Sequence, residues 1–429
     1  MRSAHVMAYG AVVLAAVVPM ACMASGDEEP SVPVRPDENA TSVLDGEAPL
    51  PDADPGDEPD GSVEAAPCSE AGWCTTVLPD VDLVMKDIWV FPSRAVAVAE
   101  SPTLGIKVLE WLDAEARWRY IDDGTQNDLG ISAAEQFVGK IWMPNENEVY
   151  YGVSRARGFE SIPGYIYHGT RTAQGTWSWA RDLVGNGNAG NAGNPSIGVW
   201  GTSHDDVYAW FNDTIYRRTS ADGAPPEWIA EYAAADPDFG TEKFFFFGAA
   251  GTSADDIWFA GARVRSGYGT CALLVRKTSN VYGRVADGSN AQLNRCTERA
   301  GAQLIGGAEG GLTDIHALGL GDLVALKGGR DVIRIKAEGE PYSTAIASVP
   351  MTVSPGALNS LAAVGGDLWL GGTGRVVRGG AVWDGGAFGL STIWAGGTPM
   401  TQAIWQVKGT SNGNLWAIGV RNALHKTTL

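Results

Sequence analysis

The chain has 429 residues, among them 56 Gly and 16 Trp, and its formal net charge is −19. Nucleic-acid-binding proteins need clustered Lys and Arg to displace counterions from phosphates, so this acidic balance argues against a nucleic-acid partner. The length fits two or three ordinary domains, or one repeat architecture closed on itself.

The chain begins like an exported protein. Arg2 precedes an apolar run from Val6 to Val18, and small residues follow at Ala21 and Ala24, so we assign residues 1–26 to a signal peptide. The run is too short to cross a bilayer comfortably, and no later segment offers about 20 uninterrupted apolar residues.

The end of this signal resembles a bacterial lipobox. Ala21 and Cys22 match the pattern, whereas Pro19 and Met20 depart from it. The resemblance implies that Cys22 becomes the lipid-modified first residue and that the protein meets a membrane through this anchor only. Ordinary cleavage after Ala24 is the alternative.

Residues 27–66 form the next segment, which contains 13 Asp or Glu, one Arg and seven Pro, with no aromatic residue. Such a sequence cannot bury enough apolar surface to offset its chain entropy. We therefore expect a disordered, extended tether that carries most of the negative charge of the chain.

Four cysteines remain beyond the signal, and an even number in an exported chain favours disulfides. Proximity along the chain predicts the pairs Cys68 with Cys74 and Cys271 with Cys296. A zinc site is the alternative, but no Cys-x-x-Cys spacing supports it, so we expect no metal centre.

All the tryptophans lie beyond residue 72, in a body with an internal repeat. Residues 199–209 and 249–259 share an apolar pair, then Gly-Thr-Ser-x-Asp-Asp, then an alternating apolar and aromatic run. This order predicts a strand, a tight turn and a second strand. Weaker copies follow the same order elsewhere in the body. When all copies are counted, the second residues of the apolar pairs, which we call hubs, fall at positions 89, 142, 200, 250, 316, 362 and 405.

Each repeat contains four candidate strands in roughly 50 residues, which is typical of a β-propeller blade. We expect an all-β fold in which residues 67–429 form a single seven-bladed propeller, with six or eight blades as alternatives. The last repeat stops after three strands, and residues 73–78 resemble the outer strands 117–121 and 227–230. We therefore expect this N-terminal strand to complete the last blade and close the ring.

The repeated core resembles the tryptophan-rich propeller repeats of bacterial surface lipoproteins. Residues 366–373 and 412–419 are similar to the short, kelch-like propeller repeats of bacterial sensor ectodomains. The resemblance implies a propeller and a contact role at the cell surface, and it brings no catalytic residue with it.

The pairs Asp205–Asp206 and Asp255–Asp256 could bind Ca²⁺, which takes six to eight oxygen ligands. They recur at one position of the repeat without a third carboxylate, so we interpret them as turn residues. The hub tryptophans, Trp405 among them, are interpreted as packing between blades. Four tryptophans lie off the repeated positions and are candidates for ligand stacking: Trp177, Trp210, Trp383 and Trp394.

These observations predict an exported protein, anchored at a bacterial outer membrane or extracellular. We expect a monomeric, non-catalytic module that binds an extracellular protein or glycan without a cofactor, and residues 286–311 are the first choice for a partner surface. The alternative is a propeller enzyme, a glycosidase or lyase that acts on an extracellular polysaccharide, with carboxylates grouped only in three dimensions.

Overall fold

The computed structural model describes residues 68–129, 132–155, 163–185, 195–220, 225–306, 309–339, 341–393 and 399–428. Within these ranges the chain consists of β-strands and two short 3-10 helices, Thr125–Asn127 and Ala133–Glu135. No helix in them is long and apolar enough to span a membrane. The predicted signal peptide, Cys22 and the acidic tether lie outside the described residues.

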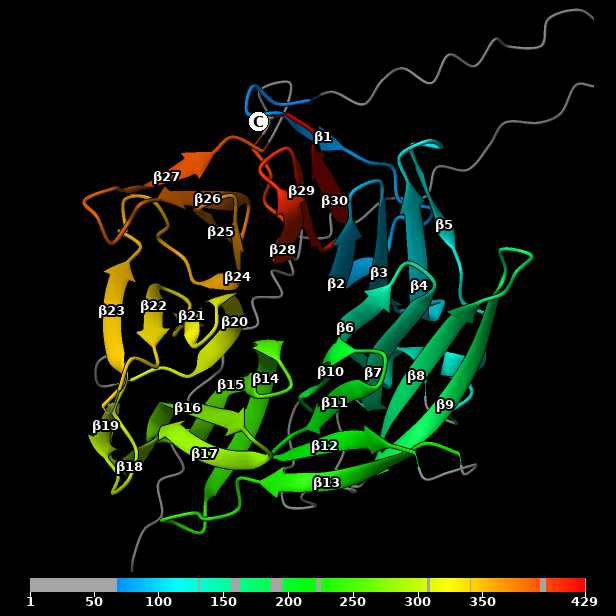
Figure 1. Cartoon of the computed structure of the whole chain (residues 1–429). Helices are drawn as coiled ribbons and strands as arrows, with labels where there is room; N and C mark the ends of the chain where they lie inside the picture. The colour runs from blue at the N-terminus through cyan, green and yellow to red at the C-terminus, as the bar shows by residue number, and fades with distance from the viewer. Residues whose placement is uncertain are drawn as a thin grey trace, which may run out of the picture. The chain divides into compact units, whose positions relative to one another are not determined.

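The strands form antiparallel sheets of four, in which chain neighbours pair (Figure 1). The first sheet contains β2 (Val84–Phe91), β3 (Arg94–Ser101), β4 (Gly105–Leu112) and β5 (Arg117–Tyr120). The second contains β6 (Gln136–Asn145), β7 (Glu148–Arg155), β8 (Gly164–Arg171) and β9 (Trp177–Gly185). The third contains β10 (Ile197–Ser203), β11 (Asp206–Phe211), β12 (Thr214–Thr219) and β13 (Glu227–Ala233), and a parallel bridge from Gly198 to Lys140 joins it to the second.

The later sheets repeat this order. The fourth contains β14 (Glu242–Ser253), β15 (Asp256–Arg265), β16 (Gly269–Thr278) and β17 (Val281–Ala286), and a hairpin of β18 (Gly288–Gln292) and β19 (Arg295–Glu298) follows it. The fifth contains β20 (Leu312–Gly319), β21 (Asp322–Lys327), β22 (Asp331–Lys336) and β23 (Ser343–Ser348). The sixth contains β24 (Leu358–Val364), β25 (Asp367–Gly372), β26 (Arg375–Gly380) and β27 (Phe388–Ser391).

The remaining sheet combines both ends of this body. It contains β28 (Ile404–Ser411), β29 (Asn414–Gly419), β30 (Asn422–Lys426) and the N-terminal strand β1 (Trp73–Thr75). Strand β1 pairs antiparallel with β30, so that Trp73 lies opposite Lys426. A disulfide from Cys68 to Cys74 encloses the turn that leads into β1.

The first strands of successive sheets, β2, β6, β10, β14, β20, β24 and β28, contact one another in turn, and β28 also contacts β2 (Figure 1). Apolar clusters fill the spaces between neighbouring sheets, because each cluster takes side chains from two of them. One joins Val96 and Val98 of the first sheet to Ile141 and Tyr151 of the second. Another joins Leu109 and Ala97 to Trp416 of the last sheet. Sheets packed face to face around a common centre make this body a β-propeller.

Strand pairing defines equivalent positions in the sheets. Trp142, Trp200 and Ala250 on first strands lie opposite Tyr150, Tyr208 and Trp258 on second strands, as the repeat predicted. In the last sheet the residue opposite Trp416 is Lys408. The prediction that placed this hub at Trp405 is wrong. Trp405 is 40% exposed, because it stands at the start of β28 and packs between no blades.

Candidate functional site

A cavity of about 230 Å³ lies among the first strands, where the sheets converge. Its lining comes from β2, β6, β10, β14, β20 and β28, together with Trp210 of β11. The polar and aromatic members of the lining are Trp89, Lys140, Trp200, Asp314, His316 and Lys408. Residues more than 300 positions apart therefore meet at one site.

Tryptophan and aliphatic side chains form much of the wall. Trp89 and Trp200 are half-buried and also pack against the apolar clusters between sheets. Ile141, Val199 and Ala249 supply further apolar surface. Flat aromatic walls suit a ligand that has an apolar or planar body.

Two lysines provide the positive charge. The Nζ of Lys408 lies 2.7 Å from Asp87 Oδ1, and it also lies over the Trp89 ring. The Nζ of Lys140 donates to Gln406 Oε1 at 2.7 Å and lies 3.9 Å from Asp314 Oδ1.

The two aspartates act mainly as structural connectors between sheets. Asp87 accepts the backbone N–H of Ile88 and, from the next sheet, that of Ile141. Asp314 accepts the N–H of Ile315 through Oδ1, and through Oδ2 it accepts the N–H of Leu361 and the amide of Gln406. Carboxylates that receive several N–H donors inside a protein are stabilised in the charged form.

Burial and neighbouring charges shift the pKa values of the groups around the cavity. Burial opposes the charged form of Asp314, but Lys140 and the Leu361 N–H outweigh it and hold the pKa of Asp314 below its usual value. Burial likewise opposes the charge on Lys140, yet Asp314 and Asp87 raise the pKa of Lys140. Burial lowers the pKa of Lys408 and of His316, which makes His316 neutral at neutral pH.

Two further polar groups at the cavity lack partners. No hydrogen bond of the His316 ring is found in the described part of the chain. Trp210 is 1% exposed, and its Nε1–H is buried without an acceptor among the described residues. The half-buried His316 ring is therefore a candidate contact for a ligand or a water molecule, whereas the Trp210 N–H has no surface accessible from the cavity.

The tryptophans predicted to bind a ligand lie at different sites in the structure. Trp210 lines the cavity. Trp177 lies at the start of β9, stacked on Trp179, with the Arg171 guanidinium 5.0 Å from its ring centroid. Trp383 follows β26 and packs with the cluster between the fifth and sixth sheets. Trp394 lies outside the described residues.

The aspartate pairs lie where the repeat predicted, at the turns between first and second strands. Asp205 is exposed, whereas Asp206 accepts hydrogen bonds from Thr202, Tyr208 and Arg217. Asp256 does the same with Thr252, Trp258 and Arg276. The described residues contain no group of three His, Cys, Asp or Glu that could hold a metal ion.

A third carboxylate occupies the equivalent position in the second sheet. Glu148 accepts hydrogen bonds from Tyr150 Oη at 2.6 Å, from His168 Nε2 at 2.9 Å and from His204 Nδ1 at 2.6 Å. Burial opposes its charge, but these three hydrogen bonds lower the pKa of Glu148 to about 2. His204 comes from the next sheet, so the cluster joins two sheets.

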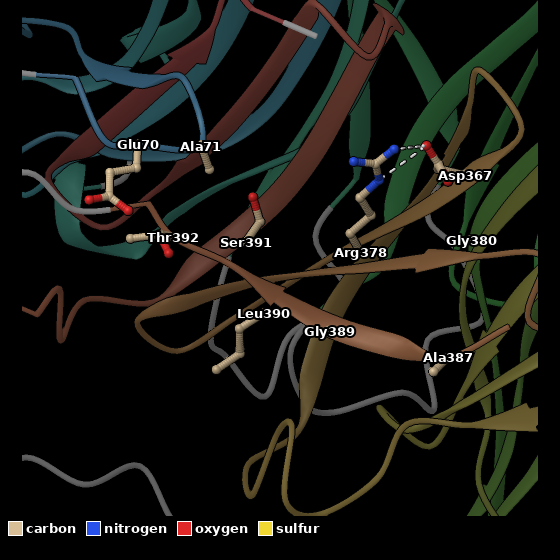
Figure 2. A pocket seen from close by; sticks show the side chains of 10 residues that line it. All are labelled: Glu70, Ala71, Asp367, Arg378, Gly380, Ala387, Gly389, Leu390, Ser391 and Thr392. Carbon is tan, nitrogen blue, oxygen red and sulfur yellow. Dashed lines mark hydrogen bonds and ion pairs between the residues drawn. The ribbon is translucent and has the colours of Figure 1, made fainter.

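A larger and shallower hollow of about 610 Å³ lies beside β27. Figure 2 shows Leu390 and Ser391 in this strand and Thr392 directly after it, with Glu70 of the N-terminal segment on the same hollow. The Arg378 guanidinium in its wall is held by Asp367 at 2.7 Å. No aromatic side chain among the described residues lines this hollow, so it offers weaker recognition than the central cavity.

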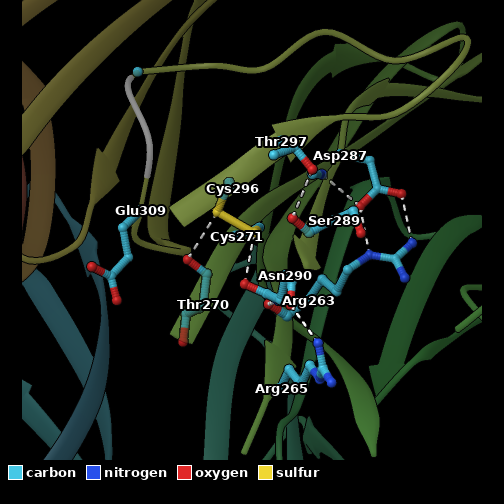
Figure 3. The surroundings of a disulfide bond; sticks show 12 residues. Arg263, Arg265, Thr270, Cys271, Asp287, Ser289, Asn290, Cys296, Thr297 and Glu309 are labelled. Carbon is cyan, nitrogen blue, oxygen red and sulfur yellow. Dashed lines mark hydrogen bonds and ion pairs between the residues drawn. A yellow bond between two sulfur atoms is a disulfide. The ribbon is translucent and has the colours of Figure 1, made fainter. Parts of the chain in front are cut away.

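The segment predicted as a partner surface, residues 286–311, contains the β18–β19 hairpin. Its disulfide joins Cys296 to Cys271 of β16 (Figure 3). The fully buried Arg263 pairs with Asp287 at 2.8 Å and Glu242 at 2.7 Å, which fixes the base of the hairpin. Leu293 at its tip is exposed.

Sequence reasoning missed the polar residues that line the cavity, Lys140, Asp314, His316 and Lys408, and the two that bind its lysines, Asp87 and Gln406. One signal was available for Lys408. The repeat keeps eight residues between a hub and the aromatic of the next strand, as from Trp200 to Tyr208. The same count back from Trp416 leads to Lys408.

Comparisons with known proteins show the fold. No family model and no curated protein matches the sequence. The solved structure of YCF48 bound to D1 peptide is 13% identical with a TM-score of 0.51, and the match covers 85% of this chain and all of that one. YCF48 from Cyanidioschyzon merolae is 12% identical with a TM-score of 0.54, over 82% of this chain and 98% of that one. At these identities the likeness concerns the architecture alone.

Proposed function

We propose that this protein is an exported, monomeric binding module without catalytic activity, which recognises a segment of an extracellular protein or glycan at the centre of its propeller. The observation that carries the proposal is the central cavity, where Lys140, Lys408 and His316 share one lining with the indoles of Trp89, Trp200 and Trp210. Polar groups placed among apolar surfaces are typical of ligand sites.

We infer that the propeller has seven blades and is closed by β1. The pairing of β1 with β30 and the contact between β28 and β2 support this inference. A ring held at both ends keeps its first strands at fixed spacings, so the cavity they line is preorganised for binding.

The peptide in the YCF48 structure supports a protein segment as the ligand. That protein shares only the architecture, so the argument here rests on the cavity itself. A glycan is the second class of ligand, because Trp89 and Trp200 offer half-buried indole faces of the kind that stack on sugars.

The carboxyl groups favour binding over hydrolysis. A glycosidase needs a carboxylic acid whose pKa is raised, so that it can protonate the leaving group. Wherever a described Asp or Glu has a displaced pKa, the displacement is downward, as at Asp314, Asp256 and Glu148. The two carboxylates near the cavity, Asp87 and Asp314, already interact with lysine and backbone donors.

Export is part of the proposal, with lipidation at Cys22 and an outer-membrane or extracellular location. The two disulfides support an oxidising compartment. An inhibitor of lipoprotein signal peptidase should make an unprocessed form accumulate. Unchanged processing would contradict lipidation and leave the binding proposal intact.

The binding proposal is tested with the full chain on peptide and glycan arrays, and with chromogenic hydrolase substrates in parallel. We expect selective array binding that Lys408→Met weakens, and no turnover. Turnover abolished by Asp314→Asn would replace the binding proposal with an enzymatic one.

A further inference from the structure

We propose that the central cavity binds a carboxylate group carried on a small apolar or aromatic body, with the carboxylate between Lys140 and Lys408. This inference rests on the proposed binding function and names the chemistry of its ligand.

The two ammonium groups have donors to spare. An ammonium group has three N–H donors. Lys408 directs one to Asp87 and Lys140 directs one to Gln406, and both residues line the cavity. The remaining donors can serve a guest, and charge-assisted hydrogen bonds to a carboxylate are stronger than neutral ones.

The neighbouring aspartates balance the charge of the two lysines but have little acceptor capacity left. Asp87 receives two backbone N–H donors from Ile88 and Ile141 in addition to Lys408. Asp314 receives two backbone donors and the Gln406 amide, and its Oδ1 remains 3.9 Å from Lys140. Their lone pairs are thus largely occupied by the protein, whereas each lysine has three N–H donors and retains some of them for a guest.

Two neutral groups complete the site. The Trp210 Nε1–H is buried without an acceptor among the described residues, although its indole lines the cavity. His316 also lines the cavity, and its ring makes no hydrogen bond to a described residue. The Trp210 indole therefore contributes wall surface, and the His316 ring is the neutral polar group that faces a guest.

The size and walls of the cavity restrict the rest of the ligand. A volume of about 230 Å³ is below the usual range for drug-sized ligands, so the guest is a small acid or one terminal residue of a peptide. The indoles of Trp89 and Trp200, with Val199 and Ala249, favour an apolar or aromatic body over a polar one. Inorganic phosphate has the charge and lacks this body.

Titration of the full chain with matched probes distinguishes the two sources of the carboxylate, a free acid and a protein terminus. Binding is measured by calorimetry and by tryptophan fluorescence. Phenylacetate represents a free acid, and phenylacetamide is its neutral control. A peptide ending in Phe with a free C-terminus represents a protein terminus, and the C-terminally amidated peptide is its control.

We expect at least one acid to bind at least tenfold more tightly than its amide, because an ion pair and its hydrogen bonds are lost in the amide. Tighter binding of phenylacetate identifies a free acid, and tighter binding of the peptide identifies a chain terminus. Equal affinity of acid and amide, or stronger binding of inorganic phosphate, would overturn the proposal.

Variants locate the site. Lys408→Met should weaken acid binding by about 10- to 100-fold, and Trp210→Phe by about 3- to 10-fold through the loss of indole surface from the cavity wall. Trp177→Phe is the matched control, because Trp177 also has a buried Nε1–H without a described partner but lies on β9, outside the cavity lining. Equal losses in Trp210→Phe and Trp177→Phe would contradict the assignment.

Folding of each variant is checked by its melting temperature. If Lys408→Met fails to fold because Asp87 is left unpaired, Asp87→Asn/Lys408→Met removes both charges and tests the same loss. Array ligands that bind independently of a carboxylate would overturn this inference and leave the proposed binding function standing.

Discussion

His168 lies flat against Tyr150, with ring centroids 4.2 Å apart and ring planes 2° from parallel. The two residues face each other across the β7–β8 pair, and the same register places Arg217 opposite Tyr208 and Arg276 opposite Trp258. An acidic residue stands two positions before each aromatic. Each of these sheets thus contains an acid, an aromatic ring and a basic residue at equivalent positions.

Removal of the acid from one such set should be costly. Asp256 is fully buried and accepts hydrogen bonds from Thr252, Trp258, Arg276 and the Gly321 N–H of the next sheet. We expect Asp256→Ala to lower the free energy of unfolding by about 3 kcal/mol, because it leaves a partly buried guanidinium unpaired. Chemical denaturation measures this, and exposed Asp255→Ala, expected within about 0.5 kcal/mol of wild type, is the control. Equal effects would contradict the turn interpretation.

The Glu148 cluster predicts a loss of stability in acid. The pKa of Glu148 is about 2 in the folded protein and near its usual 4.5 in the unfolded chain. A lowered carboxyl pKa stabilises the fold above pH 4.5, and this contribution disappears as the pH falls towards 2. Its size is about 1 to 2 kcal/mol, since solvent screens the exposed His204.

The measurement compares wild type with Glu148→Gln by denaturation between pH 6 and pH 2.5. The stability difference should be largest at pH 6 and shrink as the pH falls. A difference that stays constant over this range would show that the charge of Glu148 contributes nothing.

The N-terminal strand should contribute strongly to stability. Trp73 in β1 is 1% exposed, donates from Nε1 to Ser391 Oγ at 2.9 Å and meets the Trp369 ring edge-on. Trp73→Ala should cost about 3 to 5 kcal/mol, because it empties a large buried site between two sheets. Val77→Ala, at an exposed position four residues later, should leave the melting temperature unchanged. Similar melting of both variants would contradict a structural role for β1.

The two disulfides should differ in their effect. Cys271 and Cys296 are 25 residues apart, and Cys68 and Cys74 are six apart. The longer loop loses more entropy in the unfolded chain, so Cys271→Ser/Cys296→Ser should cost about 3 kcal/mol and Cys68→Ser/Cys74→Ser about 2 kcal/mol. The opposite order in urea denaturation would indicate that local packing, rather than loop closure, sets these values.

The Gly-Thr-Ser-x-Asp-Asp turns predicted the strand pairs around Trp200 and Ala250, because turn chemistry and alternation are local properties. The hub was predicted at Trp405 because a large indole was expected to be buried. The register of this strand is instead defined by the turn that follows the strand. In the first sheet the charges are reversed: Arg94 stands two positions before Val96, and Glu110, opposite Val96, pairs with Arg94 at 3.4 Å. No repeat rule predicts such an inversion.

The cavity itself was beyond sequence reasoning. Lys140 and Lys408 look like ordinary charged residues in their own strands, and Asp314 lies 174 positions from Lys140 in the printed sequence. Only the packing of first strands around a common centre brings them together. The repeat pattern singled out Trp210 as a residue off the repeated positions, and the structure places it in the cavity lining; that it binds a ligand stays a prediction.

The ring closed by Cys68 and Cys74 has a mechanical consequence. A pull on the chain before Cys68 passes through the sulfur bridge directly to Cys74 in β1, and the five residues between them bear little of the load. The force then acts on the β1–β30 pairing while Trp73 keeps its buried position. With this disulfide reduced, the same pull would detach the turn from Ser69 onward, and Trp73 would be the first residue of β1 to bear the load.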